Sequence, residues 1–302
     1  MTAHRSVIIT GGGQGLGYET ARAVAADPAW CVGLAGRNAA RTAEAARRLS
    51  GETGGTVVPL ALDLASLDDV RRFARDLPER PLPPVEALVC NAGVQCVNEI
   101  RYTGDGLEET FAVNHLAHLL LARLMLPALA RPGRIIFVAS DTHDPRRRTG
   151  MPAPVYADAH DLARPAETGP GPLHGRRRYT TSKLCNVLTA YELARRCGEG
   201  VTVNAFDPGM MPGSGLARDY GAVQRFAWNH LLPALTLLPL NIHSRRTSGR
   251  ALARLVTDPA LAATTGRYFE GTRERRSSEE SYDRAKAAEL WVTSAALTGL
   301  AG

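Results

Sequence analysis

Lysine is nearly absent from this chain of 302 residues. Only Lys183 and Lys286 are lysines among its 36 basic residues, and every other positive side chain is an arginine. A sequence that uses arginine so consistently keeps lysine where a compact, flexible ammonium group does what a rigid guanidinium group cannot do. Lys183 is therefore a candidate for a chemical role.

Paired cysteines are also missing. The chain has five cysteines, an odd number, and no two of them form a Cys-x-x-Cys pair: Cys31, Cys90, Cys96, Cys185 and Cys197. This distribution argues against a disulfide framework and against a zinc site, and it is typical of a protein in a reducing compartment. We expect a cytoplasmic protein without a bound metal.

The apolar runs near the end of the chain are too short to cross a bilayer. The longest one near the end, residues 231–242, is short and is broken by Pro233 and Pro239. The first apolar strand begins at residue 6, which leaves no room for a targeting peptide before it. We therefore expect no membrane anchor.

The chain carries a net charge of +6, with arginine clusters at 146–148, 176–178 and 273–276. Such clusters occur in nucleic-acid-binding proteins and also on ordinary solvated surfaces. The sequence contains no recognised nucleic-acid module and no interleaved aromatic pattern, so we favour the solvated surface. The expected partner is a small-molecule substrate rather than a nucleic acid.

Short runs of β-branched residues alternate with longer segments that carry apolar residues at helical spacing. We expect strands at residues 6–10, 31–35, 56–61, 87–90, 134–139 and 201–205. We expect helices at residues 16–26, 39–49, 67–77, 106–129 and 179–197. This alternation predicts one α/β domain over residues 1–302, a Rossmann fold with a doubly wound parallel sheet and helices on both faces.

Two irregular segments interrupt the alternation. Residues 142–178 are rich in proline, glycine and arginine, and residues 207–243 combine prolines with apolar residues. Loops of such length in compact domains usually serve function, so we interpret them as an insert and a flap over the substrate site. A helix at 245–257, a strand at 267–269 and a helix at 279–296 complete the expected fold.

The first turn of the expected fold has the composition of a phosphate-binding loop. It follows the first strand and opens the first helix, where backbone N–H groups and the helix dipole meet a pyrophosphate. The residues that we expect to bind a dinucleotide there are Thr10, Gly11, Gly13, Gln14, Gly15, Leu16 and Gly17. Taken alone, the same glycines could form a flexible turn.

The end of the second strand is where the adenine ribose of a dinucleotide is recognised. It carries Arg37 and Asn38 rather than an acidic residue, and an arginine pairs with the 2′-phosphate of NADP. After the third strand, Asp63 and Leu64 are placed to contact the adenine. We therefore predict NADP(H) as the cofactor.

Polar and small residues follow two further strands at the same edge of the sheet. We expect Asn91, Ala92 and Gly93 to let the cofactor pass close to the backbone, and Pro208 and Gly209 to form a turn beside the nicotinamide. Ordinary turns are the alternative reading of residues 63–64 and 91–93.

Two polar residues in this region are candidates for catalysis. Ser140 ends the fifth strand, and its hydroxyl is placed to bind a substrate oxygen. Asn114 interrupts an apolar helical pattern, where a buried, satisfied amide is as good a reading as a catalytic one.

Tyr179 and Lys183 stand four residues apart. On a helix they share one face, so the ammonium group lies beside the phenol and stabilises its phenolate. Lowering the pKa of a tyrosine by two to three units takes roughly 3 to 4 kcal/mol of differential stabilisation, which a nearby cation supplies at low dielectric. The alternative is a surface helix on which the two residues are four apart by chance.

Taken in order, these motifs resemble the short-chain dehydrogenase/reductase family along nearly the full chain. The resemblance implies that Tyr179 is the general acid/base and that Lys183 lowers its pKa and binds the nicotinamide ribose. It also implies that Ser140 orients the substrate oxygen and that Asn114 holds the water of a proton relay through Lys183. The bound cofactor supplies the hydride.

Within that family, segments 182–186, 208–216 and 287–291 are similar to the branch of light-dependent protochlorophyllide reductases and retinol-dehydrogenase-type enzymes. Protochlorophyllide reductases usually carry a cysteine directly after the Pro-Gly pair, whereas this chain has Met210. We therefore expect hydride transfer between NADP(H) and a carbonyl or alcohol of a fairly large apolar or ring-containing molecule.

Two alternative functions and the oligomeric state stay open at this stage. Reduction of an activated carbon–carbon double bond uses the same residues, with Tyr179 protonating carbon instead of oxygen. A non-catalytic dinucleotide sensor would keep the fold without needing a proton donor. A homodimer or homotetramer is common in the family that the chain resembles.

Overall fold

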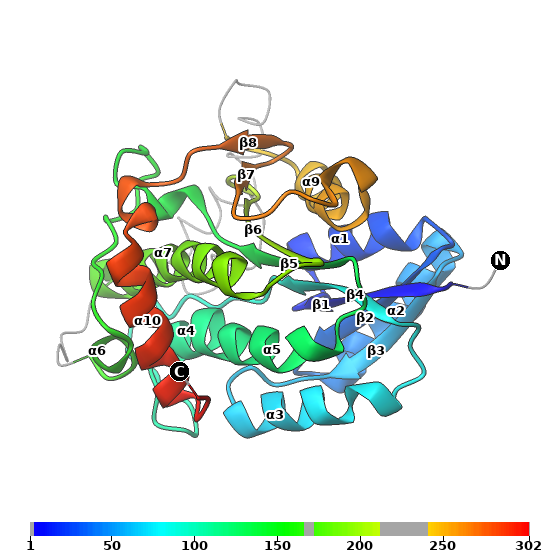
Figure 1. Ribbon diagram of the computed structural model, residues 1–302, viewed down its shortest axis with the longest axis horizontal. Helices are drawn as coiled ribbons and strands as arrows, with labels where there is room; N and C mark the ends of the chain where they lie inside the picture. The colour runs from blue at the N-terminus through cyan, green and yellow to red at the C-terminus, as the bar shows by residue number, and fades with distance from the viewer. Residues whose placement is uncertain (1–2, 166–171, 212–240, 302) are drawn as a thin grey trace.

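The computed structural model describes residues 3–165, 172–211 and 241–301. Its centre is an eight-stranded sheet with the order β3-β2-β1-β4-β5-β6-β7-β8, in which the first seven strands in this order run parallel (Figure 1). The strands are β1 Arg5–Thr10, β2 Trp30–Gly36, β3 Thr56–Ala61, β4 Val85–Cys90, β5 Gly133–Val138, β6 Val201–Asp207, β7 Tyr268–Glu270 and β8 Arg273–Arg275.

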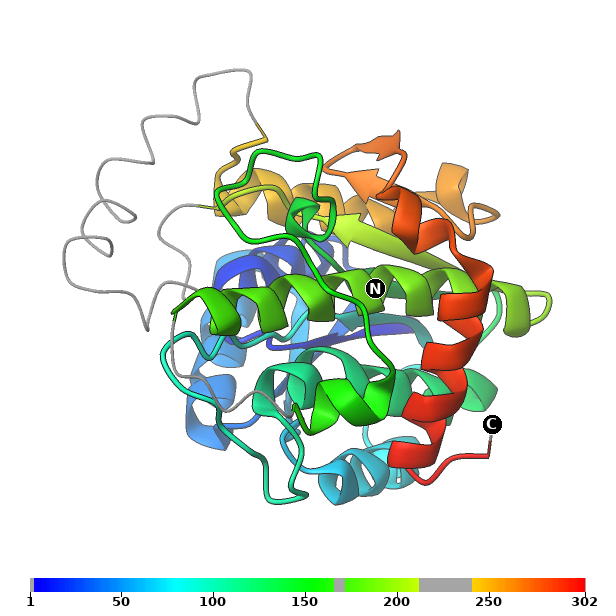
Figure 2. The same ribbon diagram turned by 90° about the vertical axis from the view of Figure 1, so that its left-hand side faces the viewer.

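Helices cover both faces of the sheet, as a doubly wound fold requires. On one face lie α1, α2 and α9, and on the other lie α3, α5 and α7, with α10 packed against α7 (Figures 1 and 2). The main helices are α1 Gly15–Ala25, α2 Ala39–Thr53, α3 Leu67–Asp76, α4 Glu109–Phe111, α5 Ala117–Met125, α6 Ala159–Ala163, α7 Pro172–Arg196, α9 Arg245–Thr257 and α10 Arg284–Leu297.

The apolar residues of the central strands alternate between the two faces. Val7 and Ile9 of β1 pack under α1 and α9, whereas Ile8 packs on the opposite side under α3 and α5, and all three are fully buried. Because both faces of a parallel sheet are covered, such a strand is apolar throughout. The strand order reverses between β1 and β4, so the loops that follow these two strands diverge and leave a crevice at the carboxyl edge of the sheet.

The expected helix over 106–129 is wrong in its outline. It is divided into α4, a π-helical turn at Ala112–Leu116, α5 and a 3₁₀ turn at Leu126–Ala128. The stretch Glu109–Ala128 is long and apolar enough to cross a membrane by composition, yet 72% of its most apolar window is buried in the protein. Its apolar side chains therefore pack in the hydrophobic core of the protein.

Helix α7 begins at Pro172, seven residues before the start expected from the sequence. Its first turns are fixed by contacts with the loop after β4: a Cβ at Gly175 would lie 2.3 Å from the Val97 carbonyl oxygen, and Arg178 donates to the carbonyls of Cys96 and Glu99 at 3.2 and 3.1 Å. Such contacts between distant segments override the local proline- and glycine-rich composition.

The end of the chain differs from the expectation in two ways. β8 pairs antiparallel with β7, and no strand was expected there. Helix α10 begins at Arg284 rather than at 279, because Asp283 caps it by accepting from the N–H groups of Ala285 and Lys286. The expected insert over 142–178 contains α6 and the start of α7, and most of the expected flap over 207–243 lies outside the described residues.

Candidate active site

A cavity of about 920 Å³ lies at the carboxyl edge of the sheet, over the ends of β1 to β6. It is lined by most of the residues that the sequence singles out: Thr10, Gly11, Gln14, Gly15, Leu16, Arg37, Asp63, Leu64, Asn91, Ala92, Gly93, Ser140, Tyr179, Lys183, Pro208 and Gly209. Gly13, Gly17, Asn38 and Asn114 are not among the residues that line it. The structure therefore brings the nucleotide motifs and the Ser-Tyr-Lys set into one space.

Several positions of the loop between β1 and α1 require glycine, and Gly11 and Gly17 do so for different reasons. Gly11 has φ of 65°, and a Cβ there would lie 2.9 Å from the Ala92 Cα atom. At Gly17 a Cβ would lie 2.6 Å from Nδ2 of Asn91, so Gly17 lets α1 pack against the loop after β4. By contrast, a Cβ at Gly13 would meet nothing within 4 Å, so this part of the loop faces open space.

The loops after β1 and β4 are tied together at the reversal point of the sheet. Asn91 Nδ2 donates to the Thr10 carbonyl at 2.7 Å. Thr10 Oγ1 accepts from the backbone N–H groups of Asn91 and Ala92 at 2.9 and 3.0 Å. These bonds fix the relative position of the two loops between which a dinucleotide is held in folds of this type.

The two residues at the end of β2 have different places. Arg37 is exposed at the cavity and has no ion-pair partner among the residues that the structure describes. Asn38 instead caps α2, because its Oδ1 accepts from the Arg41 N–H at 2.9 Å. Asn38 thus supports the helix, and Arg37 faces the cavity. Asp63 lines the cavity, and its Oδ1 accepts from the Ala65 N–H at 3.0 Å.

Tyr179 and Lys183 lie one turn apart on α7, and both are buried, with exposed fractions of 7% and 4%. The Lys183 Nζ atom lies 5.5 Å from the centre of the Tyr179 ring. It also donates to the Val138 carbonyl at 3.0 Å, and Asn186 Nδ2 donates to the same oxygen at 3.2 Å. The end of β5 thus holds the ammonium group beside the phenol.

Burial lowers the pKa of Lys183 to about 8, and the negative charge of Asp207 acts in the opposite direction. At neutral pH the ammonium form still dominates. A buried cation is strongly felt by a neighbouring phenolate, because the interior screens charge less than water does. Lys183 is therefore suited to stabilise the anion of Tyr179.

Asn114 lies in the π-helical turn, fully buried. Its Oδ1 accepts from the Val94 N–H at 2.8 Å, while its Nδ2 donates to the Val94 carbonyl and to Ser182 Oγ, both at 3.0 Å. Its side chain therefore fastens the loop after β4 to helix α7, next to Lys183. This is the satisfied amide that the sequence left as the second reading.

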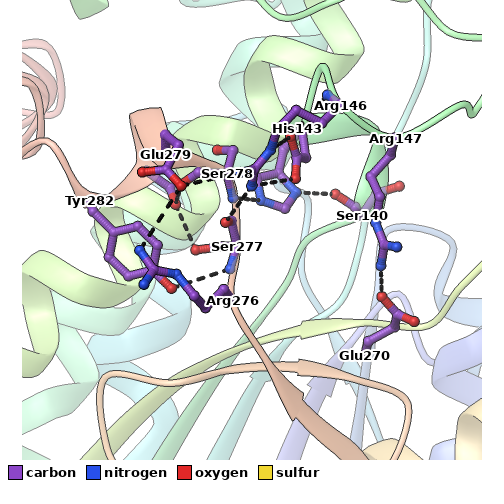
Figure 3. A network of polar contacts seen from close by, with 12 residues as sticks. Ser140, His143, Arg146, Arg147, Glu270, Arg276, Ser277, Ser278, Glu279 and Tyr282 are labelled. Carbon is purple, nitrogen blue, oxygen red and sulfur yellow. Dashed lines mark hydrogen bonds and ion pairs between the residues drawn. The ribbon is translucent and has the colours of Figure 1, made fainter.

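Ser140 follows β5 and caps a 3₁₀ turn, Asp141–His143, by accepting from the Thr142 N–H at 3.3 Å. The Ser140 carbonyl accepts from Nδ1 of His143 at 2.6 Å, and His143 Nε2 accepts from the Ser278 N–H at 3.1 Å (Figure 3). Because a carbonyl can only accept, the His143 proton lies on Nδ1 and the ring is neutral, in keeping with the lowered pKa that burial gives it.

Two arginines add to the contacts between the Ser140 loop and the segment that contains Ser278. Arg146 donates to the Ser277 carbonyl at 3.3 Å and pairs with Glu279 at 3.2 Å, and Arg147 pairs with Glu270 of β7 (Figure 3). The loop that carries Ser140 is thus fastened to the segment that follows β7. These arginines belong to clusters that the sequence left open for nucleic acid, and here they make ion pairs within the protein.

Comparisons with known proteins identify the family. The model of the short chain dehydrogenase family matches residues 5–152. Protochlorophyllide reductase B of Hordeum vulgare, a chloroplastic protein, is 34% identical over 98% of this chain and 79% of its own length. Protochlorophyllide reductase of Avena sativa is 33% identical over 98% of this chain and 100% of its own length. The chain belongs to the short-chain dehydrogenase/reductase family.

Solved structures agree with this assignment. An uncharacterised protein from Mycobacterium paratuberculosis has a TM-score of 0.72 and 27% identity, and the match covers 99% of this chain and 94% of that protein. A blue fluorescent protein from a metagenomic library, solved in complex with NADPH, has a TM-score of 0.66 and 21% identity over 89% of this chain and 98% of its own. The similarity to the second protein concerns the fold alone. Within the family, this short-chain dehydrogenase/reductase lies in the protochlorophyllide-reductase-like branch, and it is an oxidoreductase.

This short-chain dehydrogenase/reductase also has a pair of carboxyl groups beside Ser140 and Lys183 that the sequence analysis did not single out. Asp207, fully buried at the end of β6, accepts from the Gly209 N–H at 2.9 Å. Asn241 Nδ2 donates to Asp207 at 2.9 Å and to Asp141 at 3.0 Å. Burial and the neighbouring Asp141 charge raise the pKa of Asp207.

The positions of the two acids carried a usable signal. Each stands at the carboxyl end of a strand, one directly after Ser140 and one directly before Pro208, where ligands of open α/β sheets bind. Asn241 lies within the expected flap over 207–243, but nothing in the sequence distinguishes it from the other residues of that segment.

Proposed function

We propose that this short-chain dehydrogenase/reductase uses NADP(H) to reduce the carbonyl group of a fairly large apolar or ring-containing molecule, or to oxidise the corresponding alcohol. The observation that carries the proposal is the convergence of Ser140, Tyr179 and Lys183 on the cavity that the glycine loop and Arg37 also line. Its volume of about 920 Å³ lies near the upper end of the range of ligand pockets, roughly 300 to 1,000 Å³.

The residues around the glycine loop fit an NADP-type dinucleotide. The part of the glycine loop that lines the cavity, the start of α1 at Gly15 and the exposed guanidinium of Arg37 suit a pyrophosphate and a 2′-phosphate. When bound, the nicotinamide supplies or accepts the hydride.

The chain itself supplies proton transfer and position. In the reductive direction Tyr179 gives its phenolic proton to the substrate oxygen, and the Lys183 ammonium stabilises the phenolate that is left. Ser140 orients the same oxygen through its hydroxyl, held in place by the contacts of its loop. Closure of the site away from water strengthens each of these interactions.

Reduction of an activated carbon–carbon double bond is the second candidate, and the names of the relatives favour it. Met210 favours the carbonyl reaction, because it stands after Gly209 where protochlorophyllide reductases usually have a cysteine. In both reactions Tyr179 is the proton donor. The two differ in the atom that is protonated and in the carbon that receives the hydride.

Isotope labelling separates the two reactions. A panel of ring-containing ketones and enones is incubated with the protein and NADPH that carries deuterium at the transferred position. Label on a carbinol carbon supports carbonyl reduction, and label on a saturated carbon supports the second candidate. Turnover that the Tyr179→Phe variant retains in full would contradict both.

The cytoplasmic location and an assembly into homodimers or homotetramers are further parts of the proposal. Gel filtration with light scattering measures the assembly, and fractionation of the source cells measures the location.

A further inference from the structure

His118 is a buried titratable residue that the proposed chemistry does not use. It lies on α5 one turn after Asn114, and its side chain is fully buried. Its Nδ1 atom lies 3.1 Å from the Asn114 main-chain oxygen, and its Nε2 atom lies 2.9 Å from Thr10 Oγ1. The imidazole ring thus joins the end of β1 to the π-helical turn.

The partners of the ring determine which nitrogen carries the proton. The Asn114 carbonyl can only accept, so Nδ1 of His118 donates to it. Burial lowers the pKa of His118 to about 4, and the charge of Lys183 acts in the same direction, so the ring is neutral at pH 7. Nε2 is then an acceptor. The Thr10 hydroxyl has two acceptors within reach, His118 Nε2 at 2.9 Å and the Val89 carbonyl at 3.3 Å, and it donates to the nearer one.

The same hydroxyl oxygen accepts from the N–H groups of Asn91 and Ala92 at the end of β4. The bonds therefore form one chain with a single direction, from the loop after β4 through Thr10 and His118 to the Asn114 carbonyl. Hydrogen bonds arranged in series polarise and strengthen one another.

Both ends of this chain reach the site. Thr10 lines the cavity beside the glycine loop. At the other end, the Asn114 amide holds Val94 and Ser182, and a Cβ at Gly93 would lie 3.3 Å from Asn114 Oδ1 and 3.7 Å from Lys183 Nζ. The π-helical turn is therefore in contact with the environment of the catalytic lysine.

We propose that His118 is a positioning residue, which couples the dinucleotide seat formed by the loops after β1 and β4 to the Asn114 turn beside Lys183. It does so by accepting from Thr10 through Nε2 and donating to the Asn114 carbonyl through Nδ1. The inference rests on the proposed function, because the seat is taken to bind NADPH.

Substitutions of His118 that keep one of its two hydrogen bonds, or neither, test this proposal. His118→Gln keeps an amide near the position of Nε2, His118→Asn keeps one near the position of Nδ1, and His118→Leu keeps neither. His115→Leu is the matched control, because His115 is also fully buried and stands in the same π-helical turn, but its Nε2 bonds to Ser294 of α10 at 3.0 Å and not to Thr10. NADPH binding is measured by fluorescence titration of each folded variant.

We expect the dissociation constant of NADPH to rise about tenfold in His118→Leu and in His118→Asn, the size of one lost hydrogen bond. His118→Gln should stay within about threefold of the wild type, and His115→Leu should match it. NADPH affinity that is unchanged in folded His118→Leu would overturn the inference. So would an equal loss in His115→Leu, which would indicate a general effect of core substitution.

Nitrogen NMR of the histidine rings tests the hydrogen-bond chain in the wild-type protein, whatever the variants do. The neutral ring with its proton on Nδ1 is expected at pH 7, and Thr10→Val should shift the Nε2 signal much more than the Nδ1 signal. The opposite tautomer would overturn the inference. If the wild type fails to bind NADPH while its ring shows the expected tautomer, the cofactor proposal fails and the hydrogen-bond chain stands.

Discussion

Replacing Lys183 by methionine should make the free protein more stable while removing its activity. Burial lowers the pKa of Lys183 from 10.5 to about 8, and a shift of 2.5 units corresponds to about 3.4 kcal/mol of penalty on the charged form in the fold. Methionine removes this penalty. It also removes the bond to the Val138 carbonyl, worth about 1 kcal/mol, but Asn186 still donates to that oxygen. We expect a net gain of about 2 kcal/mol at pH 7.

The pH dependence of the stability separates the effect of the buried charge from the effect of the change in packing. Between pH 8 and pH 10.5 the unfolded chain holds a proton at Lys183 that the folded chain has lost, so the stability of the wild type rises with pH in this window. Integrated from pH 7 to pH 10, the rise is about 2.5 kcal/mol for this one group. The variant lacks it, so its advantage at pH 7 should largely vanish at pH 10.

Urea unfolding, followed by circular dichroism at both pH values without cofactor, measures the difference. Lys286→Met is the control for loss of a lysine charge, because Lys286 is partly exposed and pairs with Glu280. It should give no gain in stability at pH 7. A difference between wild type and Lys183→Met that is the same at both pH values would refute the reasoning about the buried ammonium group.

Three further substitutions have expected outcomes. Tyr179→Phe should lower turnover by at least about 100-fold and leave the affinity for NADPH nearly unchanged. Tyr191→Phe is the control, because Tyr191 lies on the same helix but its hydroxyl bonds to a buried serine. This control should leave turnover near the wild-type value. Arg37→Ala should weaken NADPH binding by about 10- to 100-fold and leave NADH binding unchanged. Arg41→Ala, one turn away on α2, should change the affinity for neither dinucleotide. Titration of each variant with NADPH and with NADH measures these affinities. Asn38→Ala should lower the free energy of unfolding by about 1 kcal/mol through loss of the helix cap, and the affinity for NADPH should be kept. A large loss of NADPH affinity would instead show that the Asn38 side chain contacts the cofactor.

Local chemistry made much of this fold predictable. The strands of the central sheet are apolar because both faces are covered, so short β-branched runs such as 6–10 locate them closely. The glycine loop and the Tyr179–Lys183 pair were predictable because their spacing is set by the turn and by helix periodicity. These features depend on neighbours in sequence.

Features that depend on distant contacts were missed. The π-helical turn at Asn114 is fixed by Val94, Ser182 and His118, and none of these contacts leaves a periodic signal in the sequence. The cap that Asn38 makes on α2 is a local contact that the sequence analysis did not name, and the contact of Asn38 with the cofactor stays a prediction.

The attachment of Ser140 has a consequence for the order in which the molecule is completed. A growing chain that has been made as far as Gly209 already contains the glycine loop, Arg37 and the Tyr179–Lys183 pair. The groups that hold the serine loop, from Glu270 to Glu279, are synthesised only afterwards. Ser140 is therefore fixed only once residues 270–279 have been made, after the glycine loop, Arg37, Tyr179 and Lys183 are already in the chain.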